Sequence, residues 1–302
     1  MPSLDKLLEP FFIFSQSDKR LFYIYLITSF LLGVMVLYFK EKNLKKGLIS
    51  FFNPKVIKNP SNKVDISLFF FNAFLKIFLF SFVTLSAAGV SKFSVGVLYN
   101  IFPDHSSAGW SYGKLMFVYS VVSFLFLDFS RFFQHYLFHK IPFLWRFHMV
   151  HHTAKVLTPM TLFRTHPLES LVAAFRRILV TGSVAGFFSF YNQSMIGVYA
   201  IMGVNAFDFI FNIFGSNLRH SHIWLSFGPL NYLFISPAQH QVHHSRDKKY
   251  YDTNFGIVFS FWDQLFGTFY SPKKKEFISF GVRGVEHRSF KEAVVKPFLR
   301  EL

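Results

Sequence analysis

The feature that most constrains this chain is a run of 19 residues, 21–39, that carries no charged side chain. A bilayer core of about 30 Å requires about 20 apolar residues of a spanning helix, so this run predicts a membrane span. Four further apolar runs follow, interrupted only by a few charges, at residues 64–90, 115–133, 168–190 and 194–214. Because 52% of the residues are hydrophobic and 46 are Phe, we predict an all-α integral membrane protein with about four to five transmembrane or membrane-inserted helices. The start of the chain lacks the pattern of a removable signal peptide, so the first span is expected to stay as an anchor.

Basic residues are concentrated on one side of these runs. Segment 40–63 and the tail after the last run are rich in Lys and Arg, whereas segment 91–113 holds only Lys92. Loops rich in Lys and Arg stay in the cytoplasm. Segment 40–63 and the tail are therefore expected there, and 91–113 is expected on the far side of a bacterial inner membrane or endoplasmic reticulum. The formal charge of +16 then reflects topology and attraction to anionic headgroups, and nucleic acid is not an expected partner.

The histidines follow this topology. Of 13 histidines, only His105 lies in a segment expected on the far side. Two strings share one spacing, HMVHH at 148–152 and HQVHH at 240–244, and HYLFH at 135–139 adds a pair. Residues at i, i+3 and i+4 share one face of a helix, so each triplet is expected to present its imidazoles together. Ser236, Pro237 and Gln239 form the start of a capped helix, which places the second triplet about one turn into it.

This pattern favours a metal site at the cytoplasmic ends of the helices. Neutral imidazole is the commonest transition-metal ligand, and because the chain has no cysteine the candidates are iron, zinc, copper and nickel. One metal takes about four to six ligands, so this many histidines suggests two metals. Heme, zincin and ferritin-like sites each need a different pattern, which does not occur here. His105 and His287 match no spacing and are expected to be ordinary interfacial residues.

These strings resemble the fatty acid hydroxylase and sterol desaturase superfamily of membrane di-iron oxygenases. The resemblance covers residues 115–270 and is supported by the strings RTHPLE, NLRHSH, TNFG and WDQLFGTF. It implies these metal ligands: His135, His139, His148, His151, His152, His220, His240, His243 and His244. It also implies residues that add to the ligands or hold them by hydrogen bonds, for which the candidates are His166, His222, Asn217, Asp128, Glu169 and Asp263.

The resemblance further implies a fold and an activity. About four transmembrane helices would carry a cytoplasmic helical cap, with two irons between them. With O₂ as cosubstrate, the irons would oxidise a C–H bond of a lipid or sterol, giving hydroxylation or desaturation. The chain shows no motif for an iron–sulfur cluster, a fused cytochrome b5 or a flavin or nicotinamide domain, so an external donor is expected: ferredoxin, cytochrome b5 or a reduced pterin.

Two alternatives remain open from the residues. A histidine-rich membrane metal-binding or transport protein is the second hypothesis, although transporters place such ligands near the bilayer midplane. Arg176 and Arg177 lie near the cytoplasmic end of their run, where they either extend to the interface or contact a headgroup or substrate. The expected organisation is an anchor and basic loop (1–63), a second span and far-side loop (64–114), a catalytic domain (115–270) and a basic tail (271–302).

Overall fold

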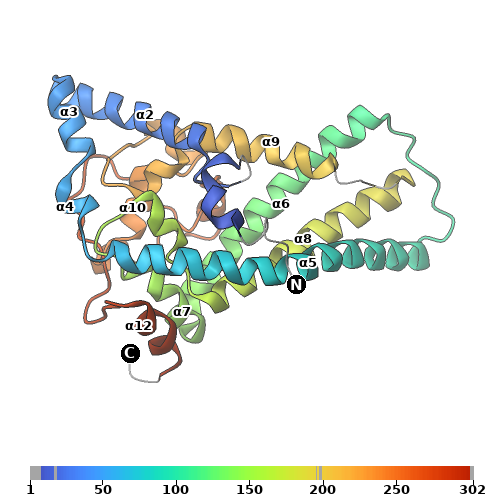
Figure 1. The fold of residues 1–302 in the computed structure, drawn as a ribbon. Helices are drawn as coiled ribbons and strands as arrows, with labels where there is room; N and C mark the ends of the chain where they lie inside the picture. Colours follow the sequence, from blue (N-terminus) through green and yellow to red (C-terminus); the bar gives the residue numbers. More distant parts are fainter. Residues whose placement is uncertain (1–7, 17–18, 195, 197–198, 300–302) are drawn as a thin grey trace.

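The computed structural model describes residues 8–16, 19–194, 196 and 199–299. Over these residues the chain forms α- and 3-10 helices with three isolated β-bridges and no strand (Figure 1). The fold class predicted from the apolar runs is confirmed in this respect.

Five long helices build the frame. They are α2 (Tyr23–Glu41), α5 (Asn62–Ile101), α6 (Tyr112–Lys140), α8 (Pro167–Asn192) and α9 (Tyr199–Ile213). In Figure 1, α2 and α9 run along one side, α5 and α8 along the other, and α6 passes between them. Among the described residues, three helices are long and apolar enough to cross a membrane, namely α2, α6 and α8. The expected run 64–90 lies in α5, and most of the described part of the run 194–214 lies in α9, whereas residues 195, 197 and 198 of that run are outside the described residues.

Helix α5 is longer than its apolar run. It has 40 residues and continues to Ile101, so about half of the far-side loop expected at 91–113 belongs to this helix. No proline interrupts residues 91–101, and the helix ends just before Phe102 and Pro103, where the chain is biased away from helical backbone. The connection to α6 is therefore short, and it packs on the end of α8, where the Trp110 N–H donates to Asn192 Oδ1 at 2.8 Å.

Close packing of α5 against α8 depends on two glycines. A Cβ at Gly182 would lie 2.6 Å from Val90 Cβ, and a Cβ at Gly186 would lie 2.7 Å from the Ser91 carbonyl oxygen. Small residues four apart let two helix backbones approach in this way, which is common in membrane proteins. On its other side α8 packs on α6 through a buried cluster that includes Leu115, Tyr119 and Phe188.

Short elements gather at the end of the frame opposite the α5–α6 connection. They are η1 (Glu9–Ser15), α3 (Leu44–Phe51), α4 (Pro54–Ile57), α7 (Pro142–His152), η2 (Pro159–Phe163), η3 (Ser216–His220), η4 (Gly228–Tyr232), α10 (Pro237–His243), η5 (Lys248–Tyr250), α11 (Phe261–Leu265), α12 (Phe290–Val295) and η6 (Lys296–Phe298). The histidine strings lie on the last turns of α6, on α7 and on α10.

A fully buried arginine fastens these short elements together. Arg164 pairs with Asp65 of α5 at 2.9 Å, and the two side chains are 0% and 1% exposed. Its other donors reach the carbonyl oxygen of Val150 in α7, the hydroxyl of Thr153 and the carbonyl oxygen of His287 in the tail. His287 was expected at an interface, but its ring is buried and its Nδ1 lies 3.0 Å from Thr153 Oγ1.

Candidate dimetal site

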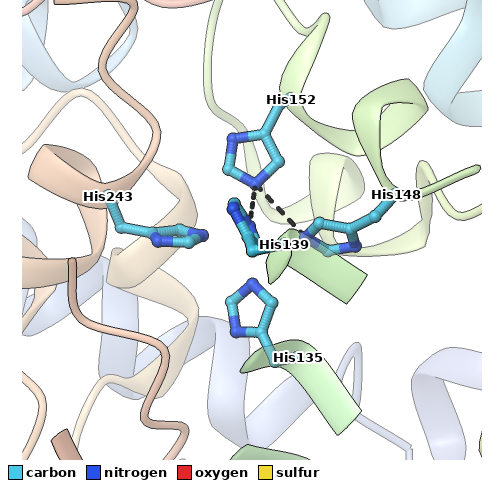
Figure 2. A group of neighbouring side chains, drawn as sticks. All are labelled: His135, His139, His148, His152 and His243. Atoms are coloured by element: carbon cyan, nitrogen blue, oxygen red, sulfur yellow. Dashed lines mark hydrogen bonds between the residues drawn. The ribbon is translucent and has the colours of Figure 1, made fainter. Parts of the chain in front are cut away.

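The first histidine cluster brings together five side chains from three strings: His135, His139, His148, His152 and His243. One nitrogen atom of each lies within 4.8 Å of the others. Figure 2 shows the imidazoles pointing toward a common centre, with His152 Nε2 3.2 Å from both His139 Nε2 and His148 Nε2. They come from α6, α7 and α10, so folding alone assembles this group.

The second cluster lies beside the first and has four histidines: His151, His220, His240 and His244. The Nε2 atom of His220 lies 3.3 Å from that of His151 and 3.0 Å from that of His240. The Nε2 atoms of His240 and His244 are 3.2 Å apart. The two clusters are in direct contact, because the ring of His152 in the first stacks on the ring of His244 in the second with centroids 4.6 Å apart.

Each HxxHH triplet divides between the two clusters. In α7, His148 and His152 face the first cluster and His151 faces the second, whereas in α10 His243 faces the first and His240 and His244 the second. The helix face on which each triplet was expected to present its imidazoles therefore lies along the boundary between the two clusters. The capping box predicted at α10 is present, since Ser236 Oγ accepts from the Gln239 N–H and Gln239 Oε1 accepts from the Ser236 N–H.

Hydrogen bonds on the outer nitrogens fix the orientation of the rings. His135 Nδ1–H donates to the Phe255 carbonyl oxygen at 2.8 Å, and His243 Nδ1–H donates to that of Thr253 at 2.7 Å. A carbonyl can only accept, so in the neutral ring the proton is on Nδ1 and the lone pair is on Nε2. Glu169 Oε1 accepts from His148 Nδ1 at 2.9 Å in the same way. The inner Nε2 atoms of His135 and His243 are buried and have no hydrogen-bond partner.

Burial keeps these imidazoles neutral. It lowers the pKa well below 6.5 in five residues outside the candidate spans, and repulsion from neighbouring imidazoles adds to the effect: His151, His152, His220, His240 and His244. Burial also lowers the pKa of His243 to about 3. Neutral lone pairs that converge at about 3 Å repel each other, and a cation between them removes this repulsion. An all-imidazole donor set fits borderline cations such as iron, zinc and copper.

The three carboxylates proposed from the sequence support the site either by contacting a ring or by fixing a neighbouring loop. Glu169 contacts a ring directly, as described above. Asp263 accepts from the N–H groups of Phe255 and Gly256, and so fixes the carbonyl that orients His135. Asp128 accepts from the N–H groups of Val258 and Phe259 and from the Trp262 indole, which ties the same loop to α6.

Three other candidates lie outside both clusters. His166 caps α8 through Nδ1, which accepts from the Leu168 N–H, and its Nε2–H donates to the Val294 carbonyl oxygen. His222 donates to the Ser50 carbonyl oxygen. The amide of Asn217 donates to the Arg20 carbonyl oxygen.

Sequence reasoning missed the aromatic wall of the first cluster. The Trp145 ring lies 4.8 Å from that of His139 and 5.3 Å from that of His152, measured between centroids. Phe255 packs on His139 at 4.8 Å and on His135 at 5.4 Å. The positions of Trp145, three residues before His148, and of Phe255, in the string TNFG, were the available signals.

Membrane-length helices and two adjacent histidine clusters define a membrane protein of the histidine-box class. Residues 120–268 match the family model named fatty acid hydroxylase. This match covers just under half of the chain, and together with the relatives below it supports the fatty acid hydroxylase superfamily.

Curated relatives include an ornithine lipid hydroxylase, OlsE, from Rhizobium tropici, which is 28% identical over 60% of this chain and 50% of its own length. Alkylglycerol monooxygenase from Homo sapiens is 26% identical over 51% of this chain and 31% of its own. A very-long-chain aldehyde decarbonylase, GL1-5, from Oryza sativa subsp. indica is 29% identical over 49% of this chain and 22% of its own. The chain thus spans half or less of these relatives' length. No solved structure matches the chain.

Proposed function

We propose that the chain is a membrane-bound, O₂-dependent di-iron oxidoreductase that hydroxylates a C–H bond of a lipid. The observation that carries this proposal is the pair of adjacent clusters, in which nine buried or half-buried imidazoles converge through their Nε2 atoms. The nine histidines named as metal ligands from the sequence are the nine that meet there. Desaturation, in which a second hydrogen is lost from the neighbouring carbon, is the variant of this chemistry that the residues leave open.

The names of the relatives support a lipid substrate. Ornithine lipid and alkylglycerol are named in two of them, and a hydroxylase and a monooxygenase both insert oxygen. The aldehyde decarbonylases share the same family region. An amphiphile that reaches the clusters from the bilayer is the substrate class that fits all of these, and a sterol belongs to this class.

When iron is bound, it would supply the activation of O₂ that an unactivated C–H bond requires. One oxygen atom enters the C–H bond and the other leaves as water, which consumes two electrons and two protons. The donor of these electrons would be an external protein or a reduced pterin, with ferredoxin and cytochrome b5 as the protein candidates. An acidic donor would be attracted to a chain of formal charge +16.

The protein's own residues orient the ligands and exclude water. Seven of the nine histidines are between 1% and 8% exposed, and Glu169 together with the carbonyl groups of Thr253 and Phe255 holds the outer nitrogens. Such outer hydrogen bonds set both tautomer and ring orientation. Trp145 and Phe255 close the apolar side of the first cluster.

The topology belongs to the same proposal. With 40–63 and the tail in the cytoplasm, the histidine clusters lie on the cytoplasmic side of a multi-pass protein. Residues 115–270 would be the catalytic part, preceded by the anchor and basic loop (1–63) and the second span (64–114) and followed by the tail (271–302).

The test is the iron content of the purified full chain. We expect about two irons per chain in the parent, and loss of about one in His148→Ala, from the first cluster, and in His220→Ala, from the second. His105→Ala is the matched control, because His105 stacks on Phe190 far from both clusters. Lipid profiling of cells that express the parent and the two variants then identifies the product.

The opposite results have definite meanings. Metal content that is unchanged in both cluster variants would show that the histidines are not ligands. Metal flux into vesicles without O₂ consumption would favour the metal-transport alternative over the oxygenase.

A further inference from the structure

Four arginines lie close to the histidine clusters. Arg131 is one turn before His135 on α6, and Arg219 directly precedes His220. Arg176 lies seven residues after Glu169, on the same face of α8. Arg20 precedes α2 and donates to the Ser216 carbonyl oxygen in η3. We call these residues, Arg20, Arg131, Arg176 and Arg219, the arginine group.

The arginine group makes almost all of its contacts with neutral acceptors. Arg176 donates to Gln134 Oε1 at 2.8 Å and to Ser130 Oγ at 2.6 Å. Arg219, which is 3% exposed, donates to the carbonyl oxygens of Ser216 and Ile257. The Nε atom of Arg20 is buried without a hydrogen-bond partner. Only Arg131 has a carboxylate partner among the described residues, Asp208 at 3.4 Å.

The charges of this group are not balanced within the described part of the chain. Burial and repulsion from Arg131 lower the pKa of Arg20 to about 10, and burial and repulsion from Arg20 lower that of Arg219. Besides Asp208, the acid within electrostatic reach is Asp128, whose oxygens already accept three hydrogen bonds. Four cations therefore face two carboxylates.

Arg164 shows how the same protein treats an arginine that is only structural. That side chain is buried as deeply as Arg219 but has a direct carboxylate partner, Asp65. Uncompensated charge away from water is costly, and an anion that binds there recovers the cost. The arginine group is therefore short of an anion.

The depth of the group matches that of a lipid headgroup. Helix α6 has 29 residues, about 43 Å at 1.5 Å per residue, whereas the hydrocarbon core is about 30 Å thick. If α6 enters the core at Tyr112, it leaves it about 20 residues later, near Arg131. The histidines then lie just outside the hydrocarbon and the arginines at its boundary.

We propose that the arginine group binds the phosphate or carboxylate of an acidic lipid, and that this lipid is the substrate presented to the histidine clusters. Guanidinium groups bind both oxyanions through paired, charge-assisted hydrogen bonds. The identity of the lipid as substrate rests on the proposed hydroxylase function, whereas the anion site does not.

The experiment measures lipid binding to the purified full chain in a neutral detergent, by native mass spectrometry. The probes are dioleoyl phosphatidic acid and dioleoylglycerol, which differ only in the phosphate, with inorganic phosphate as competitor. We expect phosphatidic acid to bind at least tenfold more tightly, and Arg131→Gln and Arg176→Gln each to remove about a tenfold advantage without changing the affinity for dioleoylglycerol. Arg176→Lys should retain part of it, because a single ammonium replaces the planar fork.

Lys114→Gln is the matched control, since it removes one positive charge from the exposed far end of the same helix; its affinities should equal those of the parent. Iron content and melting temperature of each arginine variant verify that the fold is retained. Equal affinity for the two lipids, or variants that bind phosphatidic acid as the parent does, would overturn the anion site. Displacement of the lipid by an equal concentration of inorganic phosphate would overturn its assignment to a lipid.

The two proposals fail separately. Arginine-dependent binding of phosphatidic acid by a chain that holds no iron would leave the anion site and remove the hydroxylase. Two irons per chain, with no effect of the arginine substitutions on lipid binding, would leave the hydroxylase and remove the anion site.

Discussion

At the scale of single residues, the outer hydrogen bonds of the imidazoles decide how well the clusters can hold metal. Glu169 is the only side-chain carboxylate within 3 Å of a cluster ring among the described residues, through His148 Nδ1. We expect Glu169→Ala to weaken iron retention about ten- to hundredfold. Glu169→Gln should lose less, because its amide oxygen can still accept from Nδ1–H. Iron retained during a chelator titration measures both, and equal values for Ala and parent would contradict the orienting role.

His287 gives a pH dependence that is independent of the metal ligands. Burial, with repulsion from Arg164, lowers its pKa to about 4, against about 6.5 in an unfolded chain. As the pH falls below 6.5, the unfolded state gains a proton that the folded state does not, so stability falls until the pH reaches about 4. Between pH 7 and pH 5 the loss should be about 2 kcal/mol.

The measurement is the melting temperature of the parent and of His287→Gln in detergent at both pH values. Glutamine has no titrating group, and its amide can still bond Thr153. The loss of stability between pH 7 and pH 5 should therefore be smaller in the variant by about 2 kcal/mol, and its melting temperature should fall less. Parallel pH curves for the two proteins would assign the acid sensitivity elsewhere.

At the scale of helices, the contact of α5 with α8 is the feature most sensitive to a single methyl group. A Cβ at Gly182 would meet both Val90 Cβ and the Ala87 carbonyl oxygen, at 2.6 and 2.7 Å. Because the second atom is backbone, the helices must separate, and we expect Gly182→Ala to destabilise by about 1–3 kcal/mol. Gly89→Ala is the control, since a Cβ there meets nothing within 4 Å. Thermal unfolding in detergent measures both, and similar melting temperatures would show that the close approach is not required.

Helix-scale features divide into those that local spacing predicts and those that it does not. The i, i+3, i+4 histidines and the Ser236 capping box were visible in the sequence, because both depend on residues within one or two turns. The division of each triplet between two clusters was not visible, because a spacing defines a face of one helix and not the helix opposite. The same holds for His287, whose partners Thr153 and Arg164 lie more than 100 residues away, and for α5, where apolar content ends before helical backbone does.

At the scale of the whole molecule, the tail packs into the part that holds the histidines. Ser279 accepts from the Arg246 N–H, two residues after His244, and Val294 accepts from His166 at the start of α8. Ala293 packs in a buried cluster with Val64 and Val150, and Val150 directly precedes His151. The boundary at residue 271 stays a prediction, and these contacts indicate that the segments on its two sides fold together.

We therefore expect a chain that ends at residue 270 to lose iron as well as stability. Its Arg164 would lack the His287 carbonyl oxygen as an acceptor, and Val150 would lose its cover, so α7 and both of its cluster faces would loosen. The control ends at residue 299 and keeps every contact named above. Iron content and melting temperature of the two truncated chains test whether the histidine clusters need the tail. A 1–270 chain that keeps its iron and melts like the control would show that the histidine clusters form without the tail.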